Sequence, residues 1–236
     1  MEFKLNRILT GFIISLVTVF FYLTEYDFVF FVIICSFILF DLFVINNSKI
    51  NNLIFSLFFI FIISSLFYFD IISNYILYMF FIFNLALTFF TNRINLFFSF
   101  NVCLFSLILF DMIYSNRDLF FLLIFLCFLN DSTAYIVGSK FKGPLIAKNI
   151  SPNKTWSGTL VSFFLTFSLL VLFDFNIYLS ILISLSLFFG DLYFSFIKRA
   201  LKIKDFSRSL SSHGGILDRI DSFFFSSLLI SLNSLI

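Results

Sequence analysis

Apolar stretches interrupted by short polar breaks run along the whole chain. The breaks contain charged residues, Asn or Gly, and they divide the sequence into nine stretches. A helix that crosses the hydrocarbon core of a bilayer needs roughly 20 mainly apolar residues, and ~17 are tolerated. Main-chain polar groups inside lipid must be paired within their own segment, which favours helices. The pattern predicts about nine transmembrane helices, at residues 8–24, 28–45, 53–69, 75–90, 96–114, 119–138, 158–173, 177–197 and 220–236.

The composition excludes other classes of protein. Hydrophobic residues make up 61% of the chain and charged residues only 12%, with a mean hydropathy of +1.10. A soluble domain carries about a quarter charged residues. A disordered chain is poor in aromatic residues, whereas this one has 44 Phe and 9 Tyr. The fold class expected is therefore an all-α polytopic integral membrane protein, with its first apolar run retained because no small-residue cleavage site follows it.

Basic residues are distributed unevenly between the two sides of the predicted membrane. Positive residues collect on the cytoplasmic side of membrane proteins. With a cytoplasmic N-terminus, the outer loops hold only Arg117 of the 15 Lys and Arg. The other basic residues all fall in inner segments: Lys4, Arg7, Lys49, Arg93, Lys140, Lys142, Lys148, Lys154, Lys198, Arg199, Lys202, Lys204, Arg208 and Arg219. The C-terminus is expected outside, and the net charge of +2 is too balanced to indicate nucleic acid as a partner.

This topology divides the chain into two parts. Residues 1–115 form about five spans with short connections and no evident chemistry. Residues 116–236 form about four spans and contain two long, basic, cytoplasmic loops, at 139–157 and 198–219. Cys35, Cys103 and Cys127 lie in apolar runs without metal-ligand spacing, so we expect them to be packing residues. Chemistry is therefore expected in the C-terminal part.

Two carboxylates in predicted spans lie near the ends of their helices. Asp111 is near the outer end of the fifth span, where it can reach the headgroups. Asp41 is near the inner end of the second span, with no other chemically suggestive residue nearby in the sequence. We expect both side chains to be solvated.

Four further carboxylates are predicted at one depth, just under the inner surface. Asp131 and Asp191 lie about two turns above the cytoplasmic ends of their helices. Asp218 and Asp221, spaced i, i+3, are expected on one side of the ninth helix. Clustered carboxylates repel one another unless a cation holds them, and Mg²⁺ suits a few carboxylates together with substrate phosphates. Internal salt bridges to nearby Lys or Arg are the alternative, and spacing alone does not decide between the two.

The basic loops fit a phosphate-bearing substrate. Basic residues surround the run SHGG at 212–215, in which adjacent glycines let main-chain amides approach an anion. The run SPNKT at 151–155 supplies a second small turn that contains hydroxyls and a lysine. Anchoring to anionic lipid headgroups is the alternative for the basic loops. His213, the only histidine, is by the same alternative a solvated loop residue.

The run from Ser195 to Asp221 closely resembles the signature of the phosphatidate cytidylyltransferases, also called CDP-diacylglycerol synthases. It contains SFIKR at 195–199, KD at 204–205 and HGGILDRID at 213–221. Upstream, the family resemblance extends to Asp131, Ala134-Tyr135, Gly138, Phe141, the run ISPNKTW at 150–156, Gly158 and GDL at 190–192. The resemblance covers about residues 130–222.

The chain departs from the family pattern at a few positions. The family usually has Glu where this chain has Ser157 and Phe194, and Pro-Gly where it has Ser211-Ser212. The Asp, Lys, Arg and His positions of the signature are retained. We expect a divergent active enzyme, in which restoring Glu at either position changes activity only modestly.

The resemblance implies transfer of a cytidylyl group from CTP to phosphatidate, which gives CDP-diacylglycerol and pyrophosphate in phospholipid biosynthesis. It further implies Mg²⁺, with room for a second, monovalent cation, a homodimer, and a place in the inner (cytoplasmic) membrane with the active site facing the cytoplasm. The implied catalytic residues are Asp191, Lys198, Arg199, His213, Asp218, Arg219 and Asp221. The implied substrate-binding residues are Ser151, Asn153, Lys154, Thr155, Lys204, Gly214 and Gly215. The implied metal ligands are Asp191, Asp218 and Asp221, with Asp131 as a weaker candidate.

Two other functions are compatible with part of this pattern. A CTP-dependent lipid kinase of related architecture would transfer the γ-phosphate and release CDP. A multi-pass transporter of a phosphorylated solute would place its polar site near the midplane, often between inverted repeats. Here the polar residues cluster in the last hundred residues and toward one face, which favours the cytidylyltransferase.

Overall fold

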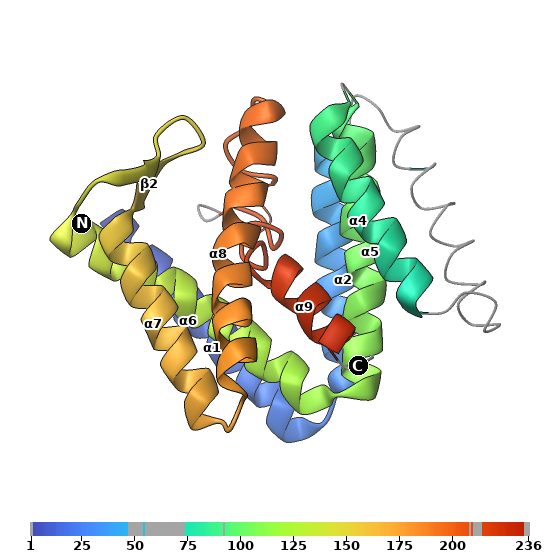
Figure 1. Cartoon of the computed structure of the whole chain (residues 1–236), viewed down its shortest axis with the longest axis horizontal. Helices are drawn as coiled ribbons and strands as arrows, with labels where there is room; N and C mark the ends of the chain where they lie inside the picture. Colours follow the sequence, from blue (N-terminus) through green and yellow to red (C-terminus); the bar gives the residue numbers. More distant parts are fainter. Residues whose placement is uncertain are drawn as a thin grey trace.

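A computed structural model describes residues 2–46, 54, 74–91, 93–207, 209 and 214–233 (Figure 1). Apart from Ile54, the third predicted span lies outside the described residues. Every other predicted stretch contains a helix. The helices are α1 (Glu2–Thr24), α2 (Asp27–Ile45), α4 (Asn74–Phe90), α5 (Ile94–Ser115), α6 (Arg117–Phe141), α7 (Trp156–Leu172), α8 (Ile177–Ala200) and α9 (Phe223–Asn233).

Within the described ranges, four helices are long and apolar enough to cross a membrane: α2, α5, α6 and α8. Shorter apolar segments lie in α1, α4 and α7, at Ile13–Thr24, Met79–Phe90 and Trp156–Leu172. Large apolar side chains such as Leu23, Phe90 and Leu172 are exposed on the outside of the helices, where lipid would cover them. The chain is thus a helical membrane protein, and the total of about nine spans stays a prediction.

The loop predicted at 139–157 contains a β-hairpin that the sequence pattern did not indicate. β1 (Leu145–Ala147) pairs antiparallel with β2 (Ser151–Thr155), with Leu145 opposite Thr155, Ala147 opposite Ser151 and a register shift between the two pairs. Thr155 then begins α7, because its side-chain oxygen accepts a hydrogen bond from the main-chain N–H of Gly158 at 3.3 Å. In Figure 1 the hairpin and the C-terminal end of α8 lie at the same end of the molecule.

The start of α9 differs from the prediction. The helix begins at Phe223, and residues 214–222 form turns, so Asp218 and Asp221 do not share a helical face. Both carboxylates take main-chain donors locally: Asp218 accepts from the N–H of Gly215 at 2.9 Å, and Asp221 from that of Ser222 at 2.8 Å. Short acidic side chains that bind nearby main-chain amides favour turns over helix.

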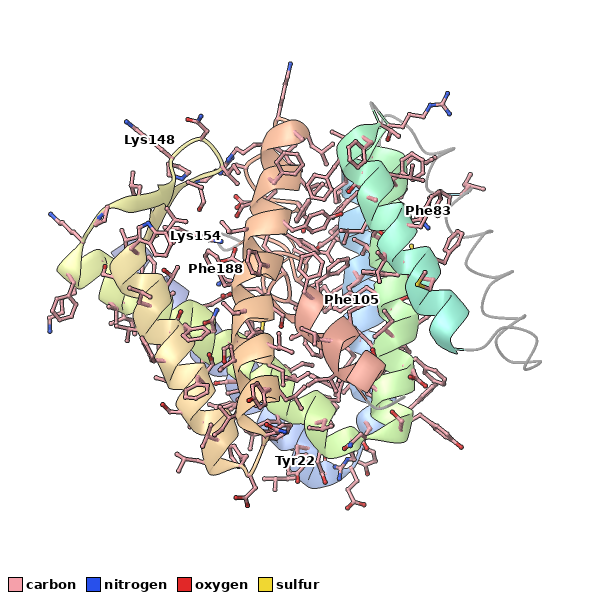
Figure 2. The ribbon with its side chains drawn as sticks, in the orientation of Figure 1. Tyr22, Phe83, Phe105, Lys148, Lys154 and Phe188 are labelled. Carbon is pink, nitrogen blue, oxygen red and sulfur yellow. The ribbon has the colours of Figure 1, made fainter. Side chains whose placement is uncertain are left out.

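Phenylalanine is the most frequent residue of the apolar interior among the described residues. Helix α9 crosses the middle of the molecule between α8 and α5, and Phe105 of α5 lies beside it (Figures 1 and 2). The rings of Phe223 and Phe224 lie 5.9 Å and 5.1 Å from that of Phe105, at angles typical of aromatic pairs. On the other side of the molecule, α7 packs closely against α6 because Gly158 has no side chain, and a Cβ there would overlap the carbonyl oxygen of Ala134.

Arg117 joins three helices at the end of the molecule opposite the hairpin. Its Nε lies 2.6 Å from Asp27 Oδ2, and its guanidinium lies 4.9 Å from the centre of the Tyr22 ring. Figure 2 shows Tyr22 at one end of the molecule and Lys148 of the hairpin at the other. The one basic residue predicted outside therefore lies at the end far from the basic hairpin.

Candidate functional site

A cavity of about 280 Å³ lies between the hairpin, α6, α7, α8 and the turns before α9. It gathers most of the predicted site residues, although they are spread over ninety positions of sequence. These are Asp131, Ser151, Lys154, Thr155, Asp191, Lys198, Arg199, Lys204, Asp218, Arg219 and Asp221. Basic and carboxylate side chains are frequent in the lining, which also includes Phe128, Phe163 and Phe188.

Helix α8 presents one polar stripe to the cavity. Asp191, Ser195 and Lys198 are spaced i, i+4 and i+7, so they follow one side of the helix. Lys198 Nζ donates to Asp218 Oδ1 at 2.8 Å, and both side chains are nearly buried. The other oxygen of Asp218 accepts the main-chain N–H groups of Phe206 and Gly215 at 3.0 Å and 2.9 Å. Asp218 thus joins α8 to the following loop.

Lys154 links the hairpin to the same helix. Its ammonium group forms an ion pair with Asp191 of α8. Figure 2 shows Lys154 between β2 and α8, with Phe188 further along α8. The internal salt bridges considered as the alternative to a metal site are therefore present at Asp191 and Asp218.

A second contact of Asp191 concerns the metal prediction. Its carboxyl group lies close to that of Asp221, and Asp131 lies close enough to act electrostatically on Asp221. Neighbouring ionised carboxylates repel each other, so such a pair needs a shared proton or a cation. Among the described residues, no group of three or more His, Cys, Asp or Glu is arranged as a metal ligand set. One or two carboxylates suffice for Mg²⁺, which keeps waters and takes phosphate oxygens, so the Asp191–Asp221 pair fits this cation.

Arg199 holds the hairpin turn against the end of α8. Its guanidinium donates to the carbonyl oxygens of Ile150 at 3.1 Å and Ile203 at 3.3 Å. Lys204 and the buried Arg219 complete the cationic lining. Positive charge therefore reaches the cavity from the hairpin, from α8 and from the loop after α8.

Other predicted site residues are not part of the observed lining. His213 lies outside the described residues, and so does the side chain of Asn153. Gly214 and Gly215 are buried beside the cavity, and the N–H of Gly215 is directed at Asp218. The anion that the glycine pair approaches in this structure is a carboxylate of the protein itself.

Sequence reasoning missed several polar residues of the lining. Asn130, Ser162, Ser184 and Ser195 are buried and line the cavity. The hydroxyl of Ser184 is enclosed, with no hydrogen-bond partner among the described residues. Helical spacing from Asp191 could have indicated Ser184 and Ser195, since they lie seven residues before it and four after it.

The expectation that Asp41 is solvated is wrong. Its side chain is 0% exposed and accepts three hydrogen bonds from the loop after α8. The nearest donors are the hydroxyl of Ser207 at 2.5 Å and the main-chain N–H of Leu217 at 2.9 Å. The prediction failed because these partners lie more than 160 residues away in the sequence. Asp111, on α5, is half-buried and is not among the described lining residues.

Of the departures from the family pattern, Ser211 and Ser212 lie outside the described residues, and Phe194 and Ser157 lie in different surroundings. Phe194 is fully buried, with its ring 5.5 Å from that of Phe98 and 5.2 Å from that of Phe224. It faces this aromatic core and is not among the lining residues. Ser157 lies in the first turn of α7, where its hydroxyl donates to the carbonyl oxygen of Lys142 at 2.7 Å.

Fold and cavity together define a class: a helical membrane protein with a polar, cation-rich cavity that connects distant segments of the chain. The chain belongs to the cytidylyltransferase family, whose family model matches residues 5–234.

Individual relatives carry a more specific name. The chain is 36% identical to the phosphatidate cytidylyltransferase of Rickettsia conorii over 134 residues, which are 50% of this chain and 58% of the relative. It is 40% identical to that of Helicobacter pylori over 105 residues, 39% of this chain and 40% of the relative. It is 42% identical to that of Staphylococcus saprophyticus over 107 residues, 41% of each chain. In these alignments the chain spans about half the length of the relatives.

Proposed function

We propose that the chain is a phosphatidate cytidylyltransferase, which converts CTP and phosphatidate to CDP-diacylglycerol and pyrophosphate. The observation that carries the proposal is a cavity whose lining brings Lys154, Lys198, Arg199 and Arg219 together with the Asp191–Asp221 pair. Family membership and the names of the relatives support the same activity. The integral membrane fold suits a substrate whose acyl chains stay in lipid.

The proposed reaction brings two highly charged anions together. A phosphate oxygen of phosphatidate attacks the α-phosphorus of CTP. A bond forms between that oxygen and the α-phosphorus, the bond from the α-phosphorus to the β-phosphate oxygen breaks, and pyrophosphate leaves. A phosphomonoester near neutral pH is already an anion, so this attack needs no strong base. Cationic side chains fixed around the phosphates offset the repulsion and stabilise the transferring group.

The described residues suit these tasks. Lys154 and Lys198 are ion-paired with carboxylates in the cavity, and a phosphate oxygen is an equally good partner for an ammonium group. Arg199, Lys204 and Arg219 add positive charge for the pyrophosphate. Ser151, Asn153 and Thr155 on the hairpin and His213 in the loop remain proposed phosphate contacts, and the apolar lining around Phe188 suits the lipid.

Asp191 and Asp221 would hold Mg²⁺, with Asp131 near them, and Asp218 is the further ligand that the family resemblance implies. When bound, the cation would neutralise phosphate charge and orient the phosphate groups for in-line displacement. The aspartates themselves fix where the phosphates lie relative to Lys154 and Lys198.

The proposal places the protein in the inner membrane with nine crossings, the hairpin and the end of α8 in the cytoplasm, and two copies in a homodimer. The topology rests on the basic residues, which gather at the hairpin end, while Arg117 lies at the other end. CTP is a cytoplasmic substrate, so the cavity must open to that side. The dimer rests on the family resemblance alone.

Incubation of the purified chain with labelled CTP, Mg²⁺ and phosphatidate in detergent tests the activity. The expected products are a labelled lipid and pyrophosphate. Release of CDP with a phosphorylated lipid would indicate the kinase instead. Intact CTP in the presence of both substrates would refute the proposed transferase.

A further inference from the structure

Helix α2, in the N-terminal part of the chain, holds the loop that follows α8. We propose that Asp41 is a positioning residue for the transfer reaction: it holds Ser207, Ser209 and Leu217 of the loop after α8, and through them fixes Asp218, Lys198 and Arg219 at the cavity. The inference rests on the proposed function for its effect on turnover. The contacts of Asp41 do not depend on that function.

Among the described residues, the hydrogen-bond donors to Asp41 are Ser207, Ser209 and Leu217, which all belong to the loop after α8. Oδ1 accepts from the hydroxyls of Ser207 at 2.5 Å and Ser209 at 3.2 Å, and Oδ2 accepts the N–H of Leu217 at 2.9 Å. The carboxylate, Ser207 and Leu217 are buried. Removing a partner from a buried polar group leaves the other unsatisfied, so these contacts determine where the loop lies.

A glycine pair lies between Asp41 and Asp218. A Cβ on Gly215 would overlap the Asp41 carboxyl group and lie 2.7 Å from the hydroxyl of Ser207. A Cβ on Gly214 would lie 2.8 Å from Asp218 Oδ2, and Gly214 has a φ of 82°, which favours glycine. The main chain is thus held closely between two carboxylates, one from α2 and one from the loop itself.

Asp218 transmits this placement to the cavity. It accepts from Lys198 Nζ at 2.8 Å and from Gly215 N–H at 2.9 Å, and Lys198, Asp218 and Arg219 all line the cavity. The described lining includes no residue of α2, so Asp41 acts only through the loop. A shift of the glycine pair would move the cation and carboxylate that face the phosphates.

The test uses Asp41→Asn in the full-length chain. The amide side chain keeps the volume, but one of its two ends becomes a donor, so it cannot accept at both Leu217 and Ser207. Asp111→Asn is the matched control, a half-buried aspartate in a neighbouring helix that does not line the cavity. Ser207→Ala is the milder second variant, because it removes one donor and leaves the Leu217 contact in place.

Two readouts are needed. Hydrogen exchange should show the Leu217 and Gly215 amides exchanging at least tenfold faster in Asp41→Asn, with α6 protected as in the wild type. The kcat for pyrophosphate release should fall at least tenfold, while the KM for phosphatidate stays within twofold. Ser207→Ala should change both readouts in the same direction by a smaller factor, and Asp111→Asn should change neither.

Unchanged hydrogen exchange at the Leu217 amide in a folded Asp41→Asn protein would show that Asp41 does not hold the loop. Faster exchange with unchanged kcat would overturn the positioning role. If Asp41→Asn does not fold, Ser207→Ala decides both points by the same criteria. If the wild type forms no pyrophosphate, the proposed function fails, and the exchange at Leu217 still decides whether Asp41 holds the loop.

Discussion

At the scale of single residues, the proposed metal and phosphate chemistry depends on two neighbouring aspartates of the cavity. Asp191 and Asp221 come from α8 and from the turns before α9, and their carboxyl groups lie close together. Lys154 of the hairpin and Lys198 of α8 line the same cavity, and Lys154 forms an ion pair with Asp191. The pair is therefore the most informative place for a conservative substitution.

Asp191→Asn and Asp221→Asn should each lower turnover by orders of magnitude, because each removes ligand charge without removing volume. Asp218→Asn should lower it as well, since Lys198 would lose its ionic partner. The measurement is pyrophosphate release from CTP and phosphatidate, with thermal melting as the check on folding. Asp111→Asn should be nearly silent, and an equal loss at Asp111 would remove the basis for assigning the aspartates by position.

The surroundings of Phe194 argue against one expectation from the sequence. The sequence predicts that restoring the family's Glu at this position has a modest effect on activity, but the Phe194 ring is fully buried against Phe98, Phe206 and Phe224. A carboxylate placed there would be buried among these aromatic rings, and an unpaired buried charge is strongly unfavourable.

Phe194→Glu should therefore lower the apparent melting temperature in detergent by roughly 10 °C, which corresponds to several kcal/mol for a chain of this size. Phe194→Leu is the control, since it keeps an apolar side chain and should cost much less. A Glu variant as stable as the wild type, with a lower Mg²⁺ requirement, would instead show that this position can reach the cavity.

At the scale of elements, the end of α8 sets the direction of the loop that follows it. The N–H of Ile203 donates to the carbonyl of Lys198 at 2.9 Å, and that of Lys202 to the carbonyl of Arg199 at 3.0 Å. This pair of bonds is the Schellman pattern, which normally has Gly in the left-handed position. Here that position is Lys202, exposed and with a φ of 59°.

Lys202→Gly should stabilise the protein by about 1 kcal/mol, because glycine adopts the left-handed conformation without the steric cost of a Cβ. Denaturant or thermal unfolding in detergent measures the change. Lys202→Ala removes the same charge and retains the Cβ, so it should not stabilise. An equal gain in both variants would attribute the effect to charge and not to backbone conformation.

The position of the hairpin depends on the close packing of α7 against α6. Thr155 both ends β2 and caps α7, and Gly158 lets α7 approach α6 closely enough for the hairpin to reach α8. Lys154 and Arg199 then connect the hairpin to α8 from both sides of the contact. The basic loop with its predicted SPNKT turn contains an antiparallel strand pair, and this pair carries Lys154 to Asp191.

At the scale of the whole molecule, the distribution of basic residues predicts the topology. The hairpin end carries Lys148, Lys154 and the end of α8, and the opposite end carries Arg117 with its partner Asp27. The N-terminus and both long loops should be cytoplasmic, and the C-terminus should lie on the other side.

A reporter that is active only in the cytoplasm should be active when fused to the N-terminus and inactive when fused to the C-terminus. A reporter inserted in the hairpin turn near Lys148 is the internal control and should be active. Activity at the C-terminus would mean an even number of crossings and would overturn the nine-span topology.

Much of the fold follows from local properties that the sequence displays directly. Lipid requires each span to pair its own main-chain groups, so length and hydropathy are enough to predict where α2, α5, α6 and α8 lie. The signature residues around Asp191 and Asp218 are close in sequence and chemically specific, and they indicate the cytidylyltransferase family to which the chain belongs. Helical spacing alone accounts for the stripe of α8 that faces the cavity.

Other features depend on contacts between distant segments, and only the tertiary structure decided them. Asp41 is buried because Ser207, 166 positions later, supplies a donor, and Phe194 is apolar because Phe98 and Phe224 surround it. The glycine pair approaches protein carboxylates because α2 and the turns before α9 bring Asp41 and Asp218 to its two sides. Burial and hydrogen bonding are properties of the packed neighbourhood of a side chain, and no local pattern in the sequence contains that neighbourhood.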